Sequence, residues 1–279
     1  MERYCDLHTH SVFSDGSLTP TELIRAARKA GLSTLALTDH NTADGLPEFL
    51  SAAEISGIEA IAGAEFSVDL DGTELHLLGL FIPREYFGQI EERMRKVLSR
   101  KEESNRDLIA ALAEDGMVLD YDELCRKTPK GRINRAHVAM ALTERGYTPS
   151  AKQAFSTLLS PEAGYYREPE RLSVWEMLDF LRSIRAVPVL AHPFLNLSPE
   201  RLSAFLPEAK KKGLVGMECY YSTYDEETTA LALRMVAEVG LKPSGGSDFH
   251  GALKPDIRLG VGRGNLKIPY EWACDLRQV

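Results

Sequence analysis

Short apolar runs alternate with amphipathic segments along most of this 279-residue chain. Seven of the apolar runs predict β-strands, and they lie at residues 4–8, 35–38, 59–62, 76–81, 187–191, 215–219 and 242–244. Five amphipathic segments predict helices, at about residues 19–31, 45–56, 171–185, 199–213 and 225–239. This alternation is typical of parallel strands joined by crossover helices, so the chain predicts an α/β fold.

The first predicted helix has a start signal and a stop signal. Thr19 can serve as the N-cap, Pro20 suits the first helical position, and Glu22 completes a capping box. Gly31 marks the other end. These local signals agree with the alternating pattern around them.

The alternation is interrupted by a segment that has few strand signals. Residues 84–116 predict one long, charged helix, and residues 121–160 predict shorter helices broken by Gly and Pro. We therefore expect a helical insertion domain at residues 83–165. The barrel domain would then consist of residues 1–82 and 166–279.

The composition is that of a globular protein, with 44% hydrophobic residues and a net charge of −8. Wrapping long duplex nucleic acid needs a broad basic surface, so we do not expect such a partner for this acidic chain. A small phosphorylated substrate or a short single strand is compatible with the charge, because bound cations would invert the local field. The four cysteines form no C-x-x-C pair, and the N-terminus lacks the basic and apolar regions of a signal peptide. No apolar run reaches the roughly 18 residues of a membrane span. We expect a cytoplasmic protein without a membrane or an evident obligate protein partner.

Histidine and acidic residues gather at the carboxyl ends of the predicted strands. The residues placed there are His8, Asp39, His40, Glu65, His192 and Asp248. A barrel of parallel strands assembles its active site at this end, from several strands at once. His10, Asp15, His76 and His250 lie near them in the sequence. Imidazole and carboxylate groups suit Zn, Mn and Fe, and a carboxylate can bridge two ions. The joint pattern predicts a metal-dependent hydrolase.

Each of these residues also has an ordinary structural explanation when it is considered alone. His8 and His10 face the same side of a strand, so they could reach one ion or form a half-buried pair. Asp15 could be a turn aspartate, and His76 could be a hydrogen-bonded core histidine. Asp248 follows two glycines, which predicts backbone that passes close to a ligand. Only the combination favours a metal site.

Arg135 and His137 lie at the start of a predicted helix within the insertion. Arg135 carries the planar guanidinium that favours phosphate oxygens, and His137 could contact the same group. The alternative for His137 is a solvated helix start without a ligand.

Four motifs together resemble those of the PHP (polymerase and histidinol phosphatase) superfamily. They are Asp6-Leu7-His8-Thr9-His10-Ser11 with Ser14-Asp15-Gly16, Leu37-Thr38-Asp39-His40, Ala191-His192-Pro193 and Ser247-Asp248-Phe249-His250. Their order matches, and the resemblance runs from residue 5 to about residue 265. The length and the helical insertion are most similar to the stand-alone PHP phosphoesterases that act on nucleoside 3′,5′-bisphosphates and short oligonucleotides.

The resemblance implies a distorted, TIM-like (β/α)7 barrel that holds two to three divalent ions, with Mn, Fe and Zn all open as the native metal. For one ion it implies the ligands His8, His10, Glu65 and Asp248. For a second ion it implies Glu65, His76 and His192, with Glu65 as the bridge. For a third ion it implies Asp15, His40 and His250. Asp39 would orient its neighbours or donate a proton.

The implied reaction is phosphomonoester hydrolysis, in which a metal-bridged hydroxide attacks phosphorus and a protein group protonates the leaving alkoxide. His192, His250 or Asp39 could supply that proton. The implied targets are the 3′-phosphate of nucleoside 3′,5′-bisphosphates and short 5′-phosphorylated oligonucleotides. Arg135 and His137 would hold a substrate phosphate.

Two other functions are compatible with the sequence. One is another PHP hydrolase, such as a histidinol phosphatase or a broad-specificity phosphoesterase. The other is a non-catalytic PHP module, against which the complete ligand set argues. An insertion that holds Arg135 over the site favours a substrate with two phosphates. The related phosphatases often carry a lysine just before the barrel resumes, whereas residues 160–166 contain none here.

Overall fold

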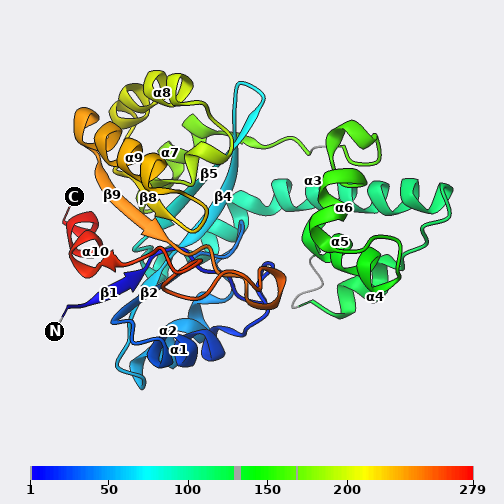
Figure 1. The fold of residues 1–279 in the computed structure, drawn as a ribbon, viewed down its shortest axis with the longest axis horizontal. Coiled ribbons are helices and arrows are strands. Elements are labelled where there is room, and N and C mark those ends of the chain that lie inside the picture. The colour runs from blue at the N-terminus through cyan, green and yellow to red at the C-terminus, as the bar shows by residue number, and fades with distance from the viewer. Residues whose placement is uncertain (1, 129–132, 168, 279) are drawn as a thin grey trace.

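The computed structural model describes residues 2–128, 133–167 and 169–278. Figure 1 shows an α/β body from which the long helix α3 (Phe87–Glu114) reaches out to three short helices. These helices are α4 (Tyr121–Arg126), α5 (Arg135–Glu144) and α6 (Ala151–Thr157), and we call them the cap. The predicted α/β class is confirmed, and the long helix and the shorter ones lie where the sequence predicts them.

The strands of the body form two sheets. The first has the order β10-β1-β2-β3, with β10 at Ile268–Pro269, β1 at Tyr4–Asp6, β2 at Thr34–Leu37 and β3 at Glu59–Ala62. The second has the order β6-β4-β5-β7-β8-β9, with β6 at Leu172–Ser173, β4 at Ala64–Leu70, β5 at Thr73–Leu80, β7 at Val187–Ala191, β8 at Gly216–Tyr221 and β9 at Lys242–Gly246.

Backbone hydrogen bonds join the two sheets at two seams. At one seam the Glu65 N–H donates to the Asp39 carbonyl at 3.1 Å, and at the other the Asp248 N–H donates to the His8 carbonyl at 2.9 Å. All four residues belong to the motifs singled out in the sequence. Because the strands are divided between two sheets, closure into a seven-stranded barrel stays a prediction.

The expectation of parallel strands is wrong for three pairs. Strand β4, which the sequence pattern did not predict, forms an antiparallel hairpin with β5, and β5 is also antiparallel to β7. Strand β10 is antiparallel to β1. The hairpin turn is Asp71-Gly72, where both residues have positive φ (50° and 79°), as a type I′ turn requires. This dipeptide is a strong hairpin signal, and it explains the reversal.

Helices cover the outer faces of the sheets. They are α1 (Pro20–Lys29), α2 (Leu46–Glu54), α7 (Val174–Ser183), α8 (Pro199–Lys211), α9 (Glu226–Val239) and α10 (Tyr270–Arg277), the last of which was not predicted. Single 3₁₀ turns occur at Arg84–Tyr86, Pro161–Ala163, Pro193–Leu195 and Gly251–Leu253. The predicted start of α1 is confirmed, because Thr19 and Glu22 form a capping box, and Gly31 has a φ of 76° just after the helix.

The body and the cap have separate hydrophobic cores. In the body, helices such as α1, α7 and α8 pack against the strands around fully buried residues such as Phe49 and Phe66. The cap packs around its own cluster with the end of α3, which includes Leu108, Val138 and Leu142. Two cores are consistent with an inserted domain, although the exact boundaries at residues 83 and 165 stay a prediction. None of the helices in the described part of the chain combines the length and hydrophobicity needed to cross a lipid bilayer.

Gly246, at the end of β9, is required by close packing where the two sheets meet. A Cβ added there would lie 2.2 Å from the Cβ of His8 and 2.7 Å from its backbone nitrogen. The approach of backbone to a ligand at the glycines before Asp248 stays a prediction. At Gly246 the close neighbour is His8, two residues after the end of β1, so this glycine lets His8 lie beside Asp248.

We predict that Gly246→Ala lowers the free energy of unfolding of the metal-free protein by about 2 kcal/mol or more, since overpacking against backbone cannot relax by a side-chain rotation. Gly88→Ala in α3 is the matched control, because nothing lies within 4 Å of its added Cβ. It should be neutral or slightly stabilising. Urea denaturation measures both variants, and equal stability would contradict this role for Gly246.

Candidate metal centre

All nine side chains predicted as metal ligands lie in one linked cluster. Most follow the carboxyl ends of strands, whereas Glu65 lies near the start of β4 and His76 lies within β5. The loop after β1 carries His8, His10 and Asp15, and the segment after β2 carries His40. Glu65 and His76 belong to β4 and β5. The segment after β7 carries His192, and the segment after β9 carries Asp248 and His250. Most of them are buried, with His40 and His76 partly open. Residues from opposite ends of the chain thus meet at one place.

Glu65 is the centre of this cluster. It is 1% exposed, and five imidazoles approach its two carboxylate oxygens. On Oε2 they are His8 at 3.2 Å, His10 at 3.2 Å and His40 at 3.0 Å, and on Oε1 they are His76 at 2.7 Å and His192 at 3.0 Å. One carboxylate with different imidazoles on its two oxygens has the arrangement of a bridging ligand.

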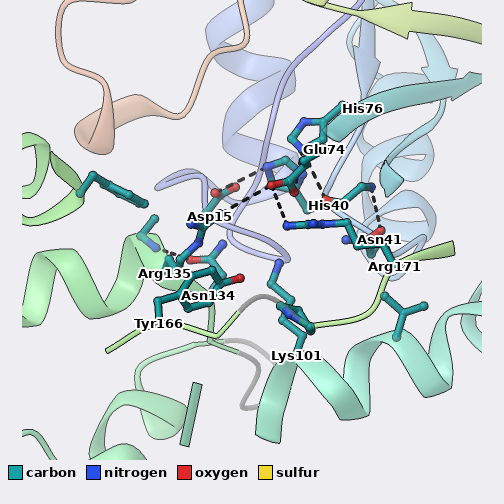
Figure 2. A pocket seen from close by; sticks show the side chains of 15 residues that line it. Asp15, His40, Asn41, Glu74, His76, Lys101, Asn134, Arg135, Tyr166 and Arg171 are labelled. Atoms are coloured by element: carbon teal, nitrogen blue, oxygen red, sulfur yellow. Dashed lines mark hydrogen bonds and ion pairs between the residues drawn. The ribbon is translucent and has the colours of Figure 1, made fainter. Parts of the chain in front are cut away.

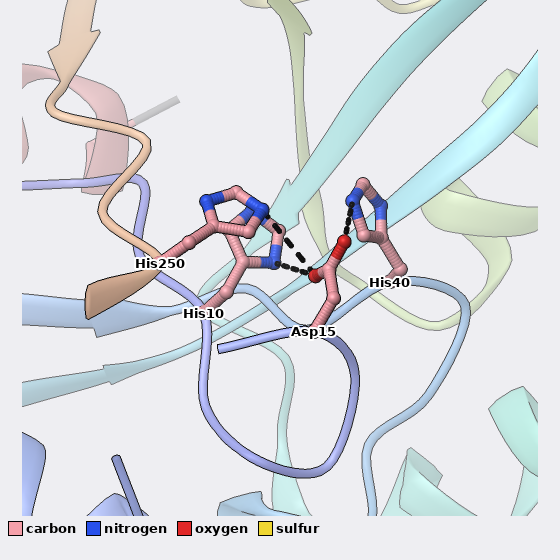
Figure 3. A group of neighbouring side chains, drawn as sticks. All are labelled: His10, Asp15, His40 and His250. Atoms are coloured by element: carbon pink, nitrogen blue, oxygen red, sulfur yellow. Dashed lines mark ion pairs between the residues drawn. The ribbon is translucent and has the colours of Figure 1, made fainter. Parts of the chain in front are cut away.

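Asp15 and Asp248 extend the cluster on one side. Figure 3 shows the imidazoles of His10, His40 and His250 around Asp15. The nitrogen-to-oxygen distances to Asp15 are 3.8, 3.7 and 3.3 Å in that order. Oδ1 of Asp248 lies 3.2 Å from Nε2 of His10. Its Oδ2 instead accepts hydrogen bonds from Tyr221 and Lys254, at 2.8 and 2.6 Å, which keeps Oδ1 turned toward the histidines.

The donor atoms fit divalent ions. Three groups have ligand atoms that all lie within 4.8 Å of one another: His10/Asp15/His40/His250, His8/His10/Glu65 and His40/Glu65/His76. Donors around one ion with metal–nitrogen bonds of about 2 Å should lie roughly 3 Å apart. Oδ1 of Asp15 and Nδ1 of His40 are buried and have no partner in hydrogen-bond geometry among the described residues, although His250 lies 3.3 Å from the first and Glu65 3.0 Å from the second. Buried polar atoms of this kind are what a metal ion would satisfy.

The predicted ligand sets agree with this geometry in part. The set of Asp15, His40 and His250 is brought together, and so are His8, His10 and Glu65. His40 also lies beside Glu65, so its assignment to one particular ion stays a prediction.

Burial and mutual attraction set the ionisation of the cluster. Burial alone would raise the pKa of Glu65, but the imidazoles of His8 and His40 hold it well below its usual range. Burial also disfavours charged His10, yet Asp248 and Glu65 outweigh it and raise the pKa of His10 to about 9. Burial dominates at His40 and lowers its pKa to about 3, which leaves this imidazole in the neutral form that binds metals.

Asp39 lies behind the ligands. Its carboxylate accepts hydrogen bonds from the backbone N–H and the hydroxyl of Ser11, at 2.8 and 2.6 Å, and from the hydroxyl of Ser14 at 2.6 Å. Ser14 Oγ in turn lies 3.3 Å from Nδ1 of His10. These contacts fix the loop that carries His10 and Asp15, and they support the orienting role of Asp39 rather than proton donation.

Three of the six non-glycine residues with positive φ in the described part of the chain lie at this site, and the other three are Asp71, Phe81 and Arg185. Asn41, His192 and Asp248 have φ angles of 55°, 28° and 55°, a region that non-glycine residues rarely adopt. Such conformations persist where the surrounding contacts over-determine them, and they are common at functional sites.

Glu218 is a functional residue that the sequence analysis missed. It lies in β8 and is fully buried. Its Oε1 is 3.0 Å from Nδ1 of His8, and its Oε2 accepts the backbone N–H of His192 at 2.8 Å. It therefore turns Nε2 of His8 toward the cluster and holds the strained backbone of His192. An acidic residue inside an apolar strand was the available signal.

A cavity of about 140 Å³ opens beside the cluster, and Figure 2 shows its lining. Asp15, His40 and His76 form one wall. Three cationic side chains also line it, namely Lys101 of α3, Arg135 at the start of α5 and Arg171 just before β6. Only Arg135 was predicted.

Two of the cations, Arg135 and Arg171, contact other side chains that line the cavity. The guanidinium carbon of Arg135 lies 4.2 Å from the ring centroid of Tyr166, and Arg171 donates to Glu74 Oε2 at 2.8 Å. Burial lowers the pKa of Lys101, and the positive charges of Arg135 and Arg171 act in the same direction. The cavity wall is therefore suited to oxyanions next to the metal ligands.

His137 lies outside this cavity. Its Nδ1 accepts the backbone N–H of Asn134 at 3.1 Å, which caps α5. It lines a neighbouring cavity of about 240 Å³ together with Gly16 and Met140. Its role in substrate binding stays a prediction.

Clustered imidazoles and carboxylates next to a cationic cavity define a metal-dependent phosphoesterase. The sequence pattern of the PHP domain matches residues 6–160. The chain belongs to the PHP domain family.

Proteins similar to this chain agree with that assignment. A 5′-3′ exoribonuclease from Haemophilus influenzae is 29% identical over 255 residues, which cover 90% of this chain and 91% of that protein. A 3′,5′-nucleoside bisphosphate phosphatase from Chromobacterium violaceum is 29% identical over 248 residues, which cover 88% and 86%. The crystal structure of a protein assigned to the metal-dependent phosphoesterases, from Bifidobacterium adolescentis, superposes with a TM-score of 0.86 at 27% identity, covering 98% and 95%.

We predict that Glu218→Gln weakens Mn²⁺ binding by about tenfold or more, as loss of a carboxylate behind a metal-binding histidine commonly does. Glutamine keeps the volume but replaces one acceptor with a donor, so either His8 or the His192 N–H loses its partner. Glu208→Gln, the same change at an exposed position of α8, is the control. Isothermal titration calorimetry measures both, and unchanged affinity in the first variant would contradict the positioning role.

Proposed function

We propose that this protein hydrolyses phosphomonoesters, and that its main target is the 3′-phosphate of nucleoside 3′,5′-bisphosphates. The observation that carries the proposal is the single cavity in which Lys101, Arg135 and Arg171 stand opposite Asp15 and His76. A substrate with two phosphates can place one against the metal ligands and the other against the cations. The similarity to a nucleoside bisphosphate phosphatase over 88% of the chain supports the same substrate class.

Two to three divalent ions, drawn from Mn, Fe and Zn, would be held by the nine-residue cluster around Glu65. When bound, such ions supply Lewis-acid charge for the phosphoryl oxygens and lower the pKa of water. The ligands proposed for them are His8, His10, Asp15, His40, Glu65, His76, His192, Asp248 and His250.

The protein groups of the cavity bind and orient the substrate. Arg135 presents a planar guanidinium that pairs with two phosphate oxygens, and stacking on Tyr166 reduces the freedom it would lose on binding. Lys101 has no carboxylate within ion-pair distance among the described residues, so its charge is free to meet an anion. Arg171 already pairs with Glu74 and supports the electrostatic field of the cavity.

The leaving alkoxide requires a proton. Asp39 is engaged by Ser11 and Ser14 behind the ligands, so the proposed donors narrow to His192 and His250. Both imidazoles reach the cluster directly, His192 at Glu65 and His250 at Asp15.

Trimming of short 5′-phosphorylated oligonucleotides is a second candidate function. The similarity to an exoribonuclease over 90% of the chain favours it. The net charge of −8 argues against long duplex substrates, since charge attraction to them would be weak. In this reading the cations of the cavity would hold the 5′-phosphate.

We predict that Asp248→Ala and His192→Ala each abolish hydrolysis of adenosine 3′,5′-bisphosphate, because each removes a proposed ligand from the cluster. Phosphate release by Mn²⁺-loaded protein measures this, and a normal circular dichroism spectrum controls for folding. Near-normal turnover in either variant would remove that residue from the ligand set.

We predict that Arg135→Ala raises KM for adenosine 3′,5′-bisphosphate by about tenfold or more, because a charge-assisted contact to phosphate is lost. KM for p-nitrophenyl phosphate, which has no second phosphate, should change far less. Arg126→Ala on the exposed side of α4 is the control. Equal effects on the two substrates would mean that Arg135 does not hold a second phosphate.

A further inference from the structure

One aromatic side chain of the cap is exposed inside the substrate cavity. Among the described residues, the large apolar side chains that stay open to solvent are Ile55, Val118, Tyr147, Phe155, Leu195 and Val261. Of these, Phe155 of α6 lines the cavity beside the metal ligands and is 38% exposed. Burying a phenyl ring is favourable, so a ring left open in a binding cavity is available to cover an apolar face of a ligand.

Other apolar residues make part of the cavity wall hydrophobic. Val97, Ala136 and Pro169 line it together with Phe155. Val97 and Lys101 are one helical turn apart on α3, so they face the same side of that helix. The cavity thus offers cations for phosphate and a small apolar surface that carries the exposed ring of Phe155. The ring of Tyr166 also lines the cavity, but it is 7% exposed and stacks on Arg135.

We infer that Phe155 is the stacking surface for the nucleobase of the substrate, an inference that rests on the proposed function. A planar heterocycle matches a phenyl ring by area and by face, and base stacking on an aromatic side chain needs no base-edge contact. An acyl chain would need a longer apolar channel than these four residues provide. A peptide would need backbone partners, and the cavity presents mainly cations and carboxylates instead.

The polar groups near this surface give little basis for selecting one nucleobase over another. Asn134 also lines the cavity, but its Oδ1 already accepts the N–H groups of Ala136 and His137 to cap α5. Stacking without edge contacts accepts every base and favours larger rings. Purine substrates should therefore bind more tightly than pyrimidine substrates, with no sharp selection between adenine and guanine.

Phe155→Ala tests the inference with two substrates that differ only in the base. They are 2′-deoxyadenosine 3′,5′-bisphosphate and the 3′,5′-bisphosphate of 1,2-dideoxyribose, which has no base. Stacking of one base is worth enough to change binding by about fivefold to 150-fold. We expect KM to rise by at least about fivefold for the nucleotide and by less than about twofold for the abasic compound, with kcat little changed.

Phe155→Trp supplies the rescue and a direct signal. It should restore the low KM, and its fluorescence should be quenched by adenosine 5′-monophosphate but not by ribose 5-phosphate, with the wild type correcting for Trp175 and Trp272. Leu195→Ala, at an exposed apolar residue outside the cavity, is the control. Equal effects of Phe155→Ala on both bisphosphates, or none on either, would overturn the inference.

The two proposals fail differently. If the wild type hydrolyses neither bisphosphate, the proposed function is wrong, while binding of the two monophosphates to Phe155→Trp still decides whether the ring stacks on a base. If hydrolysis is efficient but quenching by the nucleotide is absent, only the stacking role is wrong.

Discussion

The contact between one buried carboxylate and five imidazoles is the constraint on which the rest of the structure depends. Glu65 is almost inaccessible to solvent, and a lone ionised carboxylate in such a place would be strongly destabilising. Some of the histidines around it balance that charge in the metal-free protein by holding protons, as the raised pKa values of His10 and His76, each to about 9, indicate. Divalent ions would take over the same task, and the histidines would then give up their protons. The buried carboxylate of Glu65 therefore needs positive charge beside it in the folded protein, from protonated histidines or from metal ions.

The same residues join the two sheets. Glu65 and Asp248 use their side chains in the cluster and their backbone N–H groups at the seams, where they meet Asp39 and His8. The close packing of Gly246 on His8 lies at one of these seams. The contacts that align the two sheets therefore also align the proposed metal ligands. The cap contributes differently, because Arg135 and Phe155 come from helices that have their own core.

Local signals in the sequence predicted much of this arrangement. The strand-end positions of His8, His40 and His192 followed from the alternating pattern, since parallel strands bring their carboxyl ends to one edge. The start of α1 followed from the capping box. By contrast, the β4–β5 hairpin was missed, although residues 66–70 alternate between apolar and polar and Asp71-Gly72 marks the turn. Lys101 and Arg171 were missed for another reason: their roles arise from tertiary contacts that no local pattern encodes. Glu218 had a local signal, an acidic residue in an apolar strand, but its contact with His192, 26 positions away, had none.

The central claim is that the buried cluster around Glu65 holds divalent ions. Anomalous diffraction from crystals of metal-replete protein, recorded at the Mn, Fe and Zn absorption edges, tests it most directly. We expect more than one anomalous peak, with Glu65 coordinating at least two of the ions and Asp15 or Asp248 completing their shells. Metal-replete crystals with no anomalous peak within bonding distance of Glu65 would contradict it.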